Sequence, residues 1–186
     1  RKEHVLGSFS AVIASPCVAF SKSGHGRGFT EDRGLYYESQ ADACIEGGVA
    51  TMFMENVEEV RKPHFHPVHG RVSPVYLLKR RLGDKYVVDD RVLDSAFLGG
   101  RVSRPRSIVQ CYLKTMRDGY TKEEYRRKIE QQLAKVWAEE CDRQQSTSEW
   151  RTHIPKDPDW RKHFEVTEDG FVWPVHNKEI HRSQYL

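Results

Sequence analysis

Three histidines in the segment 64–69 are the side chains best suited to bind a metal ion. Histidines two positions apart on a strand point to the same side, and a third imidazole nearby could complete a zinc site. The interval 60–83 contains no Asp or Glu to complete a hydrolytic centre, and Pro63 and Pro67 argue against a regular strand. We therefore predict no metal site at His64, His66 and His69. An extended connector whose imidazoles form hydrogen bonds or contact a partner is the favoured interpretation, and a small His-dependent metal enzyme is the alternative.

The segment 24–28 has glycine at alternate positions and could in principle cradle a phosphate. A dinucleotide-binding fingerprint needs another glycine spacing between a strand and a helix, and a P-loop needs Gly-Lys-Ser/Thr. The segment meets neither requirement. We interpret it as a flexible loop; contacts of Lys22, His25 and Arg27 with a phosphate backbone are the alternative.

Nucleophilic catalysis has no recognisable signature in this chain. The sequence has no Gly-x-Ser-x-Gly, and its four cysteines match no catalytic motif and form no CxxC pair. The acidic pairs Asp89-Asp90 and Glu139-Glu140 are typical of a helix cap and a solvated surface. We predict no catalytic residue, no cofactor and no enzyme.

Basic side chains carry the strongest positive signal. Residues 61–120 contain 13 basic and 5 acidic side chains, a net charge of +8. Arginine binds phosphate well because its planar guanidinium offers two donors at once, and tyrosines interleaved with the basic residues could stack on exposed bases. The predicted site for RNA or an acidic partner is Lys79, Arg80, Arg81, Arg91, Arg101, Arg104 and Arg106.

Helices are expected to position these side chains. Apolar residues spaced by three and four predict a helix over 49–60, and Pro74 and Gly83 bracket a short helix over 75–82. A further short helix is predicted from Asp89 or Asp90 to about residue 97. Helices over 103–118 and 121–141, joined at Gly119-Tyr120, predict an antiparallel helical hairpin. Alternating residues around Asp169-Gly170 predict a β-hairpin over 164–173.

The predicted fold class is therefore mainly α with irregular extensions: a central helical hairpin, short helices before it and a small C-terminal β-hairpin. The predicted domains are an extended N-terminal arm over 1–41, a helical core over 42–143, and an extended C-terminal tail over 144–186 that includes the β-hairpin.

Composition favours a subunit that needs partners. Charged residues make up 31% of the 186 residues, hydrophobic residues 38%, and the mean hydropathy is -0.73. No apolar run is long enough for a transmembrane segment. The scarcity of cysteine favours a reducing compartment, and a chain that begins at Arg1 would fit removal of an organellar presequence.

Together these features predict a non-catalytic structural subunit of a large assembly, most simply a mitochondrial ribosomal protein that contacts rRNA and neighbouring protein subunits. An accessory subunit of a mitochondrial respiratory or ATP-synthase complex is the alternative. The predicted location is the mitochondrial matrix, or otherwise the cytoplasm.

Overall fold

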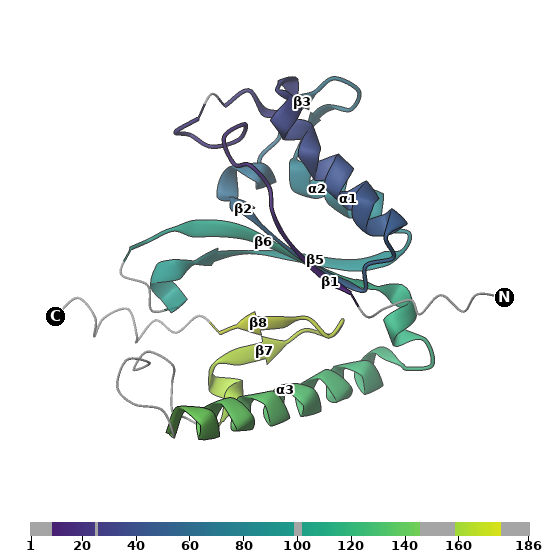
Figure 1. Ribbon diagram of the computed structural model, residues 1–186, viewed down its shortest axis with the longest axis vertical. Helices are drawn as coiled ribbons and strands as arrows, with labels where there is room; N and C mark the ends of the chain where they lie inside the picture. The colour runs from purple at the N-terminus through teal and green to yellow at the C-terminus, as the bar shows by residue number, and fades with distance from the viewer. Residues whose placement is uncertain (1–8, 25, 99–101, 146–158, 176–186) are drawn as a thin grey trace. The chain divides into compact units, whose positions relative to one another are not determined.

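The computed structural model describes residues 9–24, 26–98, 102–145 and 159–175 (Figure 1). The chain forms two compact units. Unit 1 comprises Arg1–Asp94 and Arg104–Asp118, and unit 2 comprises Ser95–Ser103 and Gly119–Leu186. The boundaries of the three predicted domains stay a prediction.

A four-stranded mixed sheet forms the centre of unit 1. Its strands are β1 (Ser10–Ala14), β2 (Thr51–Val57), β6 (Pro105–Leu113) and β5 (Tyr86–Asp94), in that spatial order. β1 and β2 are parallel, and β6 is antiparallel to both of its neighbours. The protein is thus an α/β protein, and the prediction of a mainly α fold is wrong.

Strands replace three of the predicted helices. β2 occupies the segment predicted as helix 49–60, β5 the segment around Asp89 and Asp90, and β6 the first half of the predicted helical hairpin. β6 is buried on both faces, so its apolar residues are nearly continuous and imitate helical spacing. β1 and the first half of the helix that follows it also lie in the segment 1–41, for which we predicted an extended arm.

Two helices accompany the sheet in unit 1 and lie beside each other (Figure 1). α1 (Tyr36–Glu46) connects β1 to β2 in a β-α-β arrangement. α2 (Pro74–Leu82) forms as predicted: Ser73 accepts a hydrogen bond from the Tyr76 amide at 3.1 Å, and Pro74 occupies the first turn. Both helices contribute to a core that includes Phe20, Phe29, Tyr37, Ala41, Met52, Met54, Leu78, Leu82, Tyr86 and Val109.

A short hairpin joins β2 to α2. Its strands are β3 (His64–His66) and β4 (Gly70–Val72), so the expectation that prolines prevent a strand here is wrong. Pro63 and Pro67 are tolerated because they lie just outside the three paired residues of β3. The hairpin packs on the first of several 3₁₀ turns, which are η1 (Gly28–Thr30), η2 (Asp32–Leu35), η3 (Glu58–Arg61), η4 (Ser95–Leu98), η5 (Lys114–Arg117) and η6 (Trp160–Lys162).

Unit 2 contains the longest helix, α3 (Lys122–Gln145), and a hairpin of β7 (Phe164–Val166) and β8 (Val172–Pro174). The start of α3 is a capping box: Thr121 Oγ1 accepts from the Glu124 amide at 3.2 Å, and Glu124 Oε2 accepts from the Thr121 amide at 2.8 Å. Trp137, Cys141, Trp160 and Val166 form the core of this unit. In the described part of the chain, no helix combines the length and apolarity needed to cross a membrane.

Candidate active site

The ends of β1 and β2 lie side by side at one edge of the unit 1 sheet. The two strands are in parallel register, with Ala14 opposite Glu55. In open α/β sheets, ligands bind outside the carboxyl ends of parallel strands, because the chain there leaves the sheet in loops that can carry polar groups. β6 runs the other way, so its first residues reach the same edge, with Arg106 opposite Val57.

Cys17 stands just beyond the end of β1. Ser15 and Pro16 separate it from the strand, and its carbonyl accepts hydrogen bonds from the amides of Phe20 and Ser21 at 3.0 and 2.8 Å. These bonds hold the chain in a tight turn immediately after the thiol. Among the four cysteines, Cys17 is exposed and the others are buried. An exposed thiol on an ordered turn at this edge is suited to nucleophilic attack.

An ion pair adjoins this turn. Arg106 Nε lies 2.7 Å from Glu55 Oε1, and the two side chains are 24% and 39% exposed. The register places Glu55 and Arg106 on the same face of neighbouring strands, two residue pairs apart along the ladder. The carboxylate therefore has a fixed orientation and still reaches solvent, where it can accept hydrogen bonds from a ligand.

The side chain of Asn56 links the ends of β1 and β2 through hydrogen bonds. Its side chain is buried; Nδ2 donates to the Ser15 carbonyl at 3.0 Å, and Oδ1 accepts from the Val57 amide at 2.8 Å. Burial raises the pKa of the Tyr37 hydroxyl, and a hydrogen bond with Asn56 offsets part of that rise. The amide thus fixes the carbonyl two residues before the nucleophile.

Tyr37 shows that these groups form one electrostatic cluster. Burial raises the pKa of the Tyr37 hydroxyl far above its ordinary value, and the charges of Glu55 and Cys17 raise it further. Tyr37 therefore stays a neutral donor beside Glu55 and the Cys17 turn at any physiological pH.

The sequence contains faint signals for this cluster that we did not use. The apolar, partly β-branched run Ala11-Val12-Ile13 directly precedes the Pro16-Cys17 turn, as expected for a strand that delivers a loop nucleophile. Along β2 the alternation of buried Met52, Met54 and Asn56 became visible only in the structure, because Phe53 makes the sequence there continuously apolar. The Cys17, Glu55 and Arg106 cluster itself arises only when the sheet forms.

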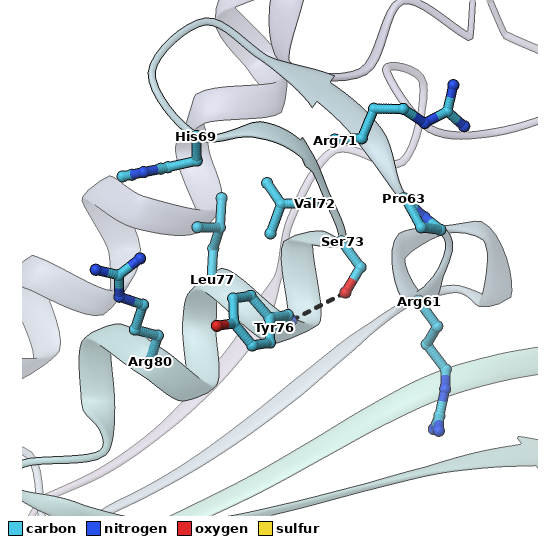
Figure 2. Close-up of a pocket in the computed structure, with 9 residues that line it drawn as sticks. All are labelled: Arg61, Pro63, His69, Arg71, Val72, Ser73, Tyr76, Leu77 and Arg80. Atoms are coloured by element: carbon cyan, nitrogen blue, oxygen red, sulfur yellow. Dashed lines mark hydrogen bonds between the residues drawn. The ribbon is translucent and has the colours of Figure 1, made fainter.

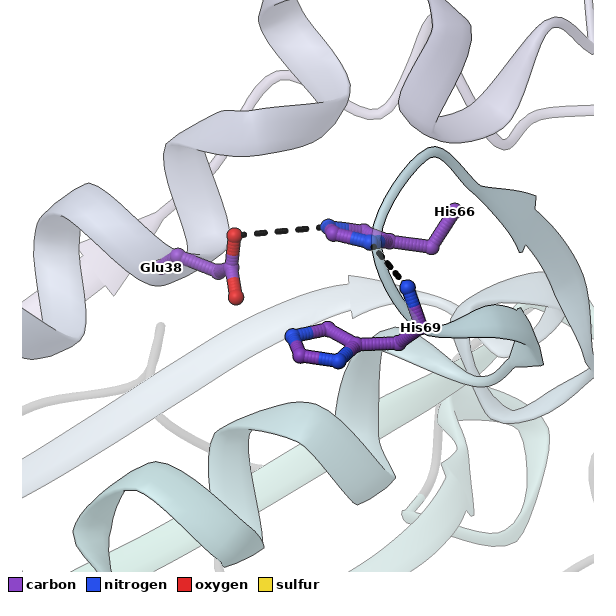
Figure 3. Close-up of side chains that lie close together, drawn as sticks. All are labelled: Glu38, His66 and His69. Carbon is purple, nitrogen blue, oxygen red and sulfur yellow. Dashed lines mark hydrogen bonds and ion pairs between the residues drawn. The ribbon is translucent and has the colours of Figure 1, made fainter.

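Helix α1 places a carboxylate, that of Glu38, beside two of the three histidines. Potential ligand atoms of Glu38, His66 and His69 lie within 4.8 Å of one another (Figure 3). However, His66 Nδ1 accepts hydrogen bonds from the amides of Val68 and His69, each at 3.1 Å. The ring proton of neutral His66 is therefore on Nε2, the atom that faces Glu38 Oε2 at 3.5 Å and that a metal would need. This tautomer disfavours metal binding, and the cluster is better described as a histidine–carboxylate pair with His69 stacked on His66.

The six predicted basic residues that the structure describes come from separate elements. Lys79 pairs with Asp90, and Arg81 pairs with Asp42 and also lies 3.4 Å from Glu38. These interactions occupy two of the three cations of α2. The remaining members lie elsewhere: Arg91 is on β5, Arg104 and Arg106 are at the start of β6, and Arg101 lies outside the described residues. Whether they bind a polyanion stays a prediction.

A pocket of about 520 Å³ opens between the β3–β4 hairpin and α2 (Figure 2). Its lining consists of Arg61, Pro63, His69, Arg71, Val72, Ser73, Tyr76, Leu77 and Arg80. The pocket is therefore cationic, with an apolar floor. It includes one of the predicted basic residues, Arg80, and one of the predicted histidines, His69.

Comparison with known proteins relates the chain to a protein family. The model of the C-5 cytosine-specific DNA methylases matches residues 9–185. No curated protein matches the chain. Similar solved structures include a methyltransferase of Entamoeba histolytica (16% identity, TM-score 0.39, covering 56% of this chain and 32% of that one). A prophage protein from E. coli, described as a DNA modification methyltransferase, has 16% identity, a TM-score of 0.45, and coverages of 61% and 29%. A mutant DNMT2 of Spodoptera frugiperda has 18% identity, a TM-score of 0.39, and coverages of 60% and 32%.

The chain therefore spans about a third of the length of these solved structures. At this level of likeness they carry no argument about function, and the assignment depends on the family model, which covers nearly the whole chain.

The match overturns the functional predictions made from the sequence. The prediction of a structural subunit of a mitochondrial ribosome, with rRNA and neighbouring subunits as its partners, is wrong. The prediction that the chain is not an enzyme is also wrong. The physical reason for the error is that the candidate catalytic groups are dispersed along the chain and meet only at the sheet edge. The predicted cellular location stays a prediction. With a family model that matches from the first described strand to the last residues, the chain belongs to the C-5 cytosine-specific DNA methylases.

Proposed function

We propose that this chain carries the base-attacking half of a DNA cytosine C-5 methyltransferase, with Cys17 as the nucleophile and Glu55 as the group that holds the cytosine. The observation that carries the proposal is the meeting of an exposed thiol and an oriented carboxylate at the carboxyl edge of β1 and β2. The family assignment supplies the substrate class, a cytosine in DNA.

Cytosine C5 is a weak nucleophile, so its methylation needs prior activation of the ring. Addition of the Cys17 thiolate to C6 forms an S–C6 bond and moves the electron pair of the C5–C6 double bond toward C5 and N3. C5 could then attack the methyl carbon of a donor, whose leaving group would depart with the electron pair of its bond to that methyl group. A base then takes the C5 proton, the electron pair of the C5–H bond re-forms the C5–C6 double bond, and Cys17 leaves as the thiolate.

Glu55 is suited to hold the ring during this addition. Carboxylates recognise cytosine by accepting from its exocyclic N4 amino group, and a protonated carboxyl can donate to N3, where negative charge develops. The ion pair with Arg106 fixes the orientation of Glu55. Because the C6 face of a cytosine is inaccessible in a stacked duplex, the target base must leave the helix to reach Cys17.

The reaction also needs a methyl donor, which supplies an electrophilic methyl group. The pocket beside α2 does not suit a cationic donor, because three arginines line it. We assign no donor site among the described residues; the addition of Cys17 to C6 does not require one.

Covalent trapping tests the proposal without a donor. An oligonucleotide with pyrimidin-2-one in place of the target cytosine has a more electrophilic C6, so a positioned thiolate should add to it and remain attached. We expect a complex with this oligonucleotide that survives denaturing electrophoresis. Replacing the nucleophile, Cys17→Ser, should abolish the complex.

Two matched variants make the result specific. Cys141→Ser removes a buried thiol of unit 2 and should leave trapping unchanged. Glu55→Gln should slow trapping at least tenfold, because an amide cannot supply the proton to N3. Equal trapping by the parent protein and Cys17→Ser would refute the assignment of the nucleophile.

A further inference from the structure

The pocket between the β3–β4 hairpin and α2 has more positive charge than its surroundings neutralise. Its lining includes Arg61, Arg71 and Arg80 and no carboxylate. Arg61 pairs with Asp90 at 2.5 Å. Within the described ranges, Arg71 and Arg80 have no ion-pair partner, although Arg81 beside them has two. Two uncompensated guanidinium groups at one cavity indicate an anionic ligand.

Three side chains that can donate hydrogen bonds lie on one side of the pocket. Figure 2 shows the Arg80 guanidinium, the Tyr76 hydroxyl and the His69 ring on the same side, whereas the ends of Arg61 and Arg71 point away from them. A guanidinium, a phenol and an imidazole present donors to a tetrahedral oxyanion from different directions. Tyr76 is 56% exposed, so its hydroxyl is accessible from solvent.

The first turn of α2 adds to the positive electrostatic potential in the pocket. Ser73 and Tyr76 both line the pocket, and together they form the N-terminal cap of the nine-residue helix. The positive end of the helix dipole therefore faces the same cavity as the arginines. Val72 and Leu77 also line the pocket and are buried.

Strand β3, which is next to the pocket, packs against the loop that follows Cys17. His64, next to the pocket residue Pro63, stacks edge-on against Phe20 with ring centroids 5.0 Å apart. A Cβ atom on Gly28 would lie 3.1 Å from the His64 Cβ, so the loop after Cys17 and β3 are in close contact.

From these observations we infer that the pocket binds a backbone phosphate of the DNA strand, with Arg80 as its principal ligand and Tyr76 and His69 as supporting donors. This inference rests on the proposed function for the identity of the polyanion. Arg80 can give two parallel hydrogen bonds to one phosphate, whereas the hydroxyl of Tyr76 gives one.

The salt dependence of DNA binding tests the inference. The full chain is titrated onto a fluorescent duplex oligonucleotide at a series of KCl concentrations, and the logarithm of the association constant is plotted against the logarithm of the salt concentration. Each phosphate contact by a cation contributes about 0.9 to the magnitude of the slope. Arg80→Gln should lower that magnitude by about 0.9, and Tyr76→Phe should weaken binding without changing the slope.

Arg127→Gln is the matched control, because it removes an exposed arginine that pairs with Glu123 on α3. It should leave the slope unchanged, and circular dichroism should show Arg80→Gln folded. The inference is overturned if Arg80→Gln has the parental slope, or if the parent protein binds no oligonucleotide. It is also overturned if inorganic phosphate binds at Arg80 while the oligonucleotide slope does not depend on that residue.

Failure of the proposed function gives a different pattern. Cys17→Ser should keep the parental salt slope, because it removes no phosphate contact. If Arg80→Gln lowers the slope while Cys17→Ser still forms the trapped complex, the phosphate site stands and the nucleophile assignment fails.

Discussion

Replacing Asn56 by alanine should be among the most damaging single changes in unit 1. Asn56 is only 2% exposed, and its side chain serves the Ser15 carbonyl, the Val57 amide and the Tyr37 hydroxyl. Truncation would leave these groups without their present partner. Each buried polar group left unsatisfied costs about 1–3 kcal/mol. A water molecule that enters the space left by the side chain would hydrogen-bond some of these groups. We therefore expect a total loss of about 4 kcal/mol in the free energy of unfolding.

Urea denaturation followed by circular dichroism measures this loss. With a slope of about 2 kcal/mol per molar urea, the midpoint of unit 1 should fall by about 2 M. Ser39→Ala is the control: Ser39 is exposed on α1, and its hydroxyl makes one long hydrogen bond of 3.5 Å to the Leu35 carbonyl. This control should change the free energy by less than about 0.5 kcal/mol.

The same variant tests the link between the strand ends and the nucleophile. Asn56 holds the carbonyl of Ser15, so its loss should also slow covalent trapping by Cys17 under conditions in which the protein remains folded. A midpoint that moves by less than about 0.3 M would refute the view that Asn56 joins β1 to β2.

Two further predictions concern thiols and glycines. Iodoacetamide at pH 8 should modify Cys17 in the native protein, and the remaining thiols only after denaturation, as mass spectrometry of the peptides would show; native labelling of a second cysteine at the same rate would contradict the burial. The protected thiols are Cys44, Cys111 and Cys141. Burial raises the pKa of Cys111 to about 12, so this thiol is also un-ionised at the labelling pH. In unit 2, Gly170→Ala should destabilise more than Gly119→Ala. Both glycines have positive φ, 85° and 84°, which costs alanine about 1–2 kcal/mol. Only at Gly170 would a Cβ also meet an aromatic ring, at 2.8 Å from Tyr125 Cε1, and equal melting temperatures would exclude this contact.

Local signals were sufficient for the elements that depend on local interactions. Ser73, Pro74 and Gly83 bracket α2, and the capping box of Thr121 and Glu124 starts α3. The positive φ of Gly170 forms the turn between β7 and β8. In each case the decisive contacts lie within a few residues along the chain, so their physics can be read from the sequence.

The strands of the central sheet are a different case. β6 pairs with β2 on one side and β5 on the other, and its buried Ile108, Val109, Cys111 and Tyr112 leave no alternation to distinguish it from a helix. Its conformation is decided by long-range partners, whose positions no local window contains. The helical interpretation of 103–118 failed for this reason.

By itself, the sequence determined where α2 begins and ends, where α3 begins and where the β7–β8 turn lies, because caps, prolines and glycines act over a single turn of chain. Only the tertiary structure decided the sheet and, with it, the candidate active site. Cys17, Glu55 and Arg106 come from three separate segments, and they meet because β1, β2 and β6 end at one edge. Their chemistry depends on mutual distance and orientation, which hydrogen-bonded register supplies and sequence spacing does not.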